Sequence, residues 1–68
     1  HPLKADTDGL EKGKLFSALK TKLGECKTPD DFSAFESVNK DALQALRDTM
    51  RSWAVQLDNT IKDGKAGG

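Results

Sequence analysis

The sequence predicts an all-α protein, folded as a small helical hairpin or a three-helix bundle. Leu is the commonest large apolar residue and β-branched residues are few, which favours helix over strand. From Phe32 to Ile61 the apolar residues recur about every 3.6 positions, the period of an α-helix. The 68 residues are expected to form one domain, residues 1–68, with flexible ends at 1–7 and 64–68.

The first helix is predicted over residues 8–23. Asp8 can act as its N-cap, and Glu11 stands three positions later, as in a capping box. Gly24 follows the helix and can adopt the left-handed conformation that often ends one. One face of this helix carries a row of leucines, at positions 15, 19 and 23.

The second helix is predicted over residues 29–37, and its start is the clearest local signal in the chain. Thr28 is a good N-cap residue, and Pro29 suits the first helical position because its missing N–H is not needed there. Asp30 and Asp31 place negative charge at the positive end of the helix dipole. Residues 24–28 therefore connect the first two helices.

Beyond residue 37 the sequence allows two arrangements. Ser37 and Asn39 are natural N-caps and Asp41 suits a following first turn, which predicts a break and a third helix over residues 40–63. No Gly or Pro forces this break, however. The alternative is one helix over residues 29–63, in a long hairpin whose far half dimerises to cover its apolar stripe.

Composition and motifs argue against several classes of protein. Eleven basic and eleven acidic residues give zero net charge, unlike an electrostatic nucleic-acid binder. The one His, His1, is terminal, and the chain has neither a catalytic constellation with Ser or Cys nor a Gly-rich phosphate loop. We therefore expect no enzyme activity, no cofactor and no metal site. No apolar run approaches the roughly 20 residues that cross a bilayer.

Cys26 is the one cysteine and lies in the predicted connection, between Glu25 and Lys27. This position predicts an accessible thiol. In an oxidising compartment, such a thiol could form an intermolecular disulfide and link two copies into a homodimer. A free thiol, or a half-buried turn residue, is the alternative.

Four side chains are candidates for contact with a protein partner. Trp53 lies near Arg47 and Arg51, and an aromatic residue with nearby Arg is the composition of an interface hot spot. Lys20 belongs to a basic first helix that also carries Lys12, Lys14 and Lys22. The alternatives are that Trp53 lies in the core and that the lysines form an ordinary solvated surface.

These observations favour a small secreted protein that acts without catalysis, by binding another protein as an inhibitor, toxin-like or immune-modulating factor. The chain begins His1-Pro2 without Met, which we interpret as a mature extracellular protein whose signal peptide has been removed. Two alternatives are an amphipathic lipid-surface protein and an oligomerisation fragment of a larger protein. The polar face of residues 43–62 mixes acidic and basic side chains. This mixture does not favour binding to anionic membranes.

Overall fold

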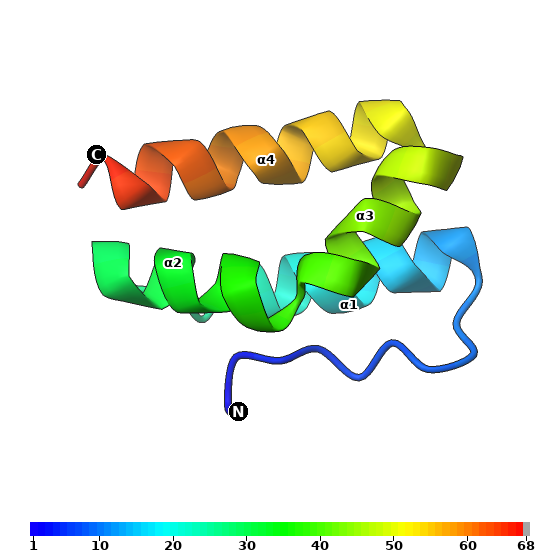
Figure 1. The fold of residues 1–68 in the computed structure, drawn as a ribbon, viewed down its shortest axis with the longest axis horizontal. Coiled ribbons are helices and arrows are strands. Elements are labelled where there is room, and N and C mark those ends of the chain that lie inside the picture. Colours follow the sequence, from blue (N-terminus) through cyan, green and yellow to red (C-terminus); the bar gives the residue numbers. More distant parts are fainter. Residues whose placement is uncertain (68) are drawn as a thin grey trace.

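The computed structural model describes residues 1–67, which form four α-helices. These are α1 (Lys12–Leu23), α2 (Pro29–Val38), α3 (Lys40–Thr49) and α4 (Arg51–Lys65). In Figure 1, α2 and α4 run side by side in opposite directions, and α3 crosses from one to the other. Every pair of helices is in contact. The predicted all-α class is confirmed, with four helices in place of the two or three expected.

The first helix begins four residues later than predicted, at Lys12. Gly9 has φ +70°, in the left-handed region, and the Leu10 N–H donates to the Thr7 carbonyl oxygen at 3.3 Å. This tight turn makes Asp8 a turn residue, so its predicted role as N-cap is wrong. At the other end Gly24 has φ −64°, so the predicted left-handed conformation is wrong as well.

The start of α2 confirms the local signal read from the sequence. The Thr28 hydroxyl accepts from the Asp31 N–H at 3.2 Å, and Pro29 occupies the first helical position. The Asp31 carboxylate in turn accepts from the Lys27 N–H at 3.0 Å. The first bond satisfies one N–H that the helix start leaves without a helical partner, and the second ties the residue before the N-cap to the first turn.

The apolar stripe from Phe32 to Ile61 is broken twice. The first break is at Asn39, as predicted, and it excludes a single helix over residues 29–63. The second is at Met50, whose φ of −139° and ψ of 74° are not helical, so the predicted continuous helix over residues 40–63 is wrong. Neither break contains Gly or Pro. Both allow α4 to fold back against α1 and α2.

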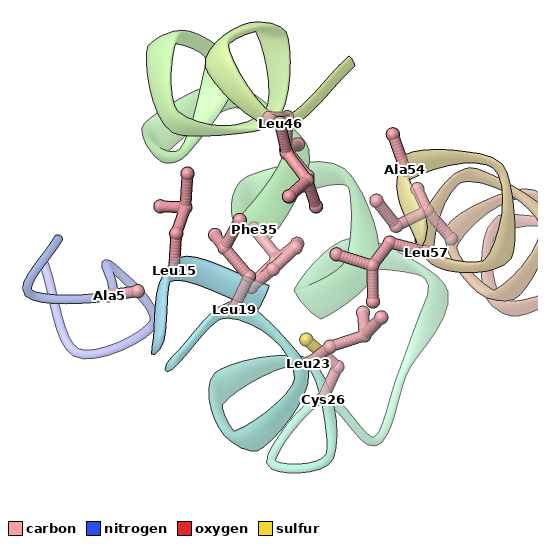
Figure 2. Close-up of a cluster of buried hydrophobic side chains, with 11 residues drawn as sticks. Ala5, Leu15, Leu19, Leu23, Cys26, Phe35, Leu46, Ala54 and Leu57 are labelled. Atoms are coloured by element: carbon pink, nitrogen blue, oxygen red, sulfur yellow. The ribbon is translucent and has the colours of Figure 1, made fainter. Parts of the chain in front are cut away.

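One apolar core joins the four helices (Figure 2). Leu19, Phe35 and Leu46 are completely buried at its centre, and they come from α1, α2 and α3. The other members of the cluster are Ala5, Leu15, Leu23, Cys26, Leu43, Ala54, Leu57 and Ile61. The radius of gyration is 10.9 Å, about what a compact chain of this length should have.

The two ends of the chain pack more closely than the sequence suggested. Ala5 is buried and its N–H donates to the side chain of Asn39 at 2.8 Å. The predicted tail begins too early, since α4 continues to Lys65 and Gly64 is buried. Gly68, also part of that tail, lies outside the described residues. The mobility of residues 1–7 stays a prediction.

Gly64 allows α4 to approach α2 closely. A Cβ at this position would overlap the ring of Phe32, whereas a Cβ at Gly13 in α1 would meet nothing within 4 Å. Helix propensity alone favours Ala over Gly by roughly 0.5–1 kcal/mol. We therefore expect Gly13→Ala to raise the free energy of unfolding. We expect Gly64→Ala to lower it by about 1–3 kcal/mol, because the Phe32 ring must move.

Chemical denaturation followed by circular dichroism measures both changes. Equal stabilisation by the two substitutions would contradict the close approach of α4 to Phe32.

Candidate functional site

An aromatic pair lies where α1 meets α4. Phe16 and Trp53 are both half-buried, and their ring centroids are 5.1 Å apart with an angle of 39° between the rings. This distance is within the range of favourable aromatic contacts. The ammonium of Lys20, one turn beyond Phe16, lies 5.8 Å from the Phe16 ring centroid. We call Phe16, Lys20 and Trp53 the aromatic–lysine surface.

An apolar groove of about 340 Å³ continues from this surface. Its lining residues come from α1, the following connection, α2 and α4, and they are Lys20, Leu23, Gly24, Cys26, Phe32 and Thr60. Lys20 belongs to both features and is the one charged residue in this lining. The groove and the aromatic–lysine surface therefore form one continuous region along the seam between α1 and α4.

The charge around this region is positive. α1 contains four lysines and no acidic residue. Within residues 1–67, Lys12, Lys14 and Lys20 form no ion pair. Two carboxylates near Cys26 are engaged, since Glu25 pairs with Lys22 at 3.4 Å and Asp31 accepts the Lys27 N–H. Lys20 is thus available to an acidic group from outside.

Cys26 is buried, so the predicted accessible thiol is wrong. Its sulfur lies 3.7 Å from the carbonyl oxygen of Asp31 and 3.9 Å from that of Lys22, and Figure 2 shows it beside Leu23. Burial raises the pKa of the Cys26 thiol, and the charges of Asp31 and Glu25 raise that pKa further. Both effects oppose the intermolecular disulfide expected from the sequence, because the thiolate is the reactive form.

Arg47 and Arg51 lie in a different place from Trp53 and Lys20. They line a polar groove of about 310 Å³ between α3 and α4, with Asp58 and the exposed Val55 among their neighbours. Arg47 donates to both carboxylate oxygens of Asp58, at 3.0 and 2.8 Å. This hydrogen bonding raises the pKa of Arg47, and it joins α3 to α4. Arg47 therefore has a structural partner already.

The four candidate contact residues thus separate into two pairs on opposite edges of the buried face of α4. The sequence pattern did not identify Phe16, Phe32 or Thr60 as parts of a surface. One signal was available: Phe16 and Lys20 are four positions apart, so they share a face of any helix that contains them. Nothing in the local sequence placed Trp53 beside Phe16.

The described part of the chain holds no group of three His, Cys, Asp or Glu side chains arranged to bind a metal ion. Among helices α1 to α4, none combines the length and apolar character needed to cross a bilayer. No protein-family model, curated protein or solved structure matches this chain. The seam between α1 and α4 is therefore the candidate functional site.

The thiol of Cys26 should react slowly in the folded protein. Because its burial and raised pKa both reduce access to the thiolate, we expect alkylation by iodoacetamide at neutral pH to be at least about tenfold slower than in the unfolded chain. Mass spectrometry of quenched time points gives both rates.

Ser17 offers a matched control, because it is exposed on α1. A Ser17→Cys chain that also carries Cys26→Ser should react at the rate of an unfolded thiol. Equal rates for folded wild type and this control would contradict the burial of Cys26.

Proposed function

We propose that this protein acts without catalysis, by binding another protein through the aromatic–lysine surface and the adjoining groove. One observation carries the proposal: Phe16 and Trp53 are incompletely buried beside an apolar groove whose one charged lining residue is Lys20. Aromatic residues that are desolvated on binding dominate the energetics of many interfaces. The same side chains placed fully inside the core would offer nothing to a partner.

The chemistry of the region favours an acidic, amphipathic helical segment as the partner. A helix laid along the seam could place one apolar side chain over Phe16 and Trp53 and another in the groove beside Phe32. Helix-in-groove recognition uses this spacing of apolar anchors. A carboxylate of the partner could pair with Lys20, and the charge on α1, four lysines without an acid, would speed association.

The lipid-surface alternative receives less support. An interfacial helix needs a free apolar face. The corresponding face of α4 lies inside the bundle, where Ala54, Leu57 and Ile61 are buried. Lipid binding through α4 would therefore require the bundle to open. Secretion, and an inhibitory, toxin-like or immune-modulating role, stay predictions from the sequence, as does origin in a larger protein.

Photo-cross-linking tests the proposal directly. Thr60 lines the groove and is exposed, so a benzophenone amino acid at this position would capture a bound partner without changing the core. The captured protein is identified by mass spectrometry, and its affinity for the purified chain is then measured by calorimetry. The expected partner segment carries acidic residues beside apolar ones.

Lys20→Glu should weaken this affinity by about tenfold or more, because it places like charges face to face in the groove. Lys14→Glu is the matched control, since Lys14 is also exposed on α1 but lies outside both the groove and the aromatic contact. We expect Lys14→Glu to change the affinity by less than about threefold through the overall field alone. Equal losses in the two variants would contradict a docking role for this surface.

Helicity in the presence of lipid separates the proposal from its alternative. The chain should show full, cooperative helicity in buffer, because its apolar residues are already buried in one core. Adding vesicles of zwitterionic or anionic lipid should leave the circular dichroism spectrum unchanged. A steep rise in helicity with either vesicle would favour the lipid-surface function.

A further inference from the structure

Residues 1–10 form a strap that packs on the bundle outside the helices. Figure 1 shows it as an extended trace that bends back into the start of α1. Ala5 is 3% exposed and belongs to the same buried cluster as Leu15 of α1 (Figure 2). Leu3 and Leu10 pack against the same core and are half-buried. The strap therefore contributes to the core although it belongs to no helix.

Asn39 holds the strap by its backbone. The Asn39 side chain accepts from the Ala5 N–H at 2.8 Å and donates to the Leu3 carbonyl oxygen at 2.9 Å. Its amide nitrogen also donates to the Phe35 carbonyl oxygen at 3.0 Å, inside the bend between α2 and α3. Asn39 is 3% exposed and is the one polar residue of the described chain that is buried. Without the strap, its amide would lose two of these three bonds.

These contacts are of the kind by which a protein can hold a peptide segment. Hydrogen bonds to the backbone of the bound segment, with a pocket for a neighbouring side chain, are one mode of peptide recognition. Here the bonds involve residue 3 and residue 5, and the small side chain of Ala5 fills the buried position. The site is occupied by the chain's own N-terminal segment.

A short hinge connects the strap to the bundle. The strap is joined to α1 by the turn at Thr7–Leu10, in which Gly9 has φ +70° and a Cβ added to Gly9 would meet no atom within 4 Å. Asp8, Gly9 and Glu11 are all exposed. Leu10 is half-buried against the core, so the bundle holds the end of the turn next to α1. At Asp8 and Gly9 the bundle does little, and closure there depends on the left-handed residue at Gly9.

We propose that the Asn39 site accepts the strap of a second copy of this chain, which gives a reciprocal strap-exchanged dimer when the hinge opens. The hydrogen bonds between Asn39 and the strap are the same in the monomer and in the exchanged dimer, and Ala5 is buried in both, because the strap and its site are unchanged. Exchange of an identical segment between two copies is a low-cost route to a dimer, and the hinge controls it. The proposal is independent of the aromatic–lysine surface, which contains no residue of the strap.

Substitution of Gly9 tests the proposal. Gly9→Val cannot adopt the left-handed turn without strain, whereas an extended hinge in the dimer relieves that strain in both copies. We expect its dimerisation constant to exceed that of the wild type by roughly 30-fold or more. Gly9→Asn tolerates the left-handed region and should stay as monomeric as the wild type. Light scattering after size-exclusion chromatography gives the masses.

Gly67→Val is the matched control. Gly67 also has a positive φ, +79°, and is open to solvent, but it is far from the strap in sequence and should not affect dimerisation. Dimerisation of Gly67→Val to the same extent as Gly9→Val would overturn the proposal, because the effect would then not depend on the hinge.

Isotope-filtered NMR identifies the exchanged contact itself. A dimer refolded from equal amounts of labelled and unlabelled Gly9→Val chains should show an Overhauser effect between the Ala5 N–H of one copy and the Asn39 side chain of the other. A monomeric Gly9→Val chain, or a dimer without this effect, would overturn the proposal. If Gly9→Val fails to fold, the same NMR measurement is made on the wild-type chain after refolding at millimolar concentration. Absence of the intermolecular Overhauser effect in that sample would overturn the proposal.

Discussion

The structure depends on the burial of one apolar stripe that runs from Phe32 to Ile61. As a straight helix these residues would extend about 45 Å, whereas the protein is 31 Å along its longest axis and α1 has 12 residues. A chain this short has no second long helix to cover such a stripe. The stripe instead bends at Asn39 and Met50, so that its segments bury one another around Leu19 of α1.

Polar side-chain contacts between separate segments accompany each bend. At the first bend the Asn39 side chain is enclosed, and the strap supplies the partners that keep its amide satisfied. Near the second bend Arg47 of α3 reaches Asp58 of α4 across the junction. That pair is about one-third exposed, so we assign it no more than about 1 kcal/mol, and apolar burial remains the larger contribution.

The candidate site is a consequence of the same packing. Because α4 returns across α1, Trp53 meets Phe16 at the seam, and neither ring is fully enclosed. Cys26 packs against the start of α2 and is buried, so the thiol that the sequence predicted to be accessible instead lines a groove. Arg47 and Arg51 are carried to the other edge of α4. The division of the contact candidates therefore follows from the bend at Met50.

The sequence by itself determined the features that depend on neighbouring residues. Thr28 and Pro29 predicted the start of α2, Asn39 marked a break, and the apolar period established the helical class. The tertiary structure alone decided the bend at Met50, the later start of α1, the burial of Cys26 and the contact of Phe16 with Trp53. These depend on contacts between segments far apart in the chain, where the gain from burying apolar area outweighs local helix preference.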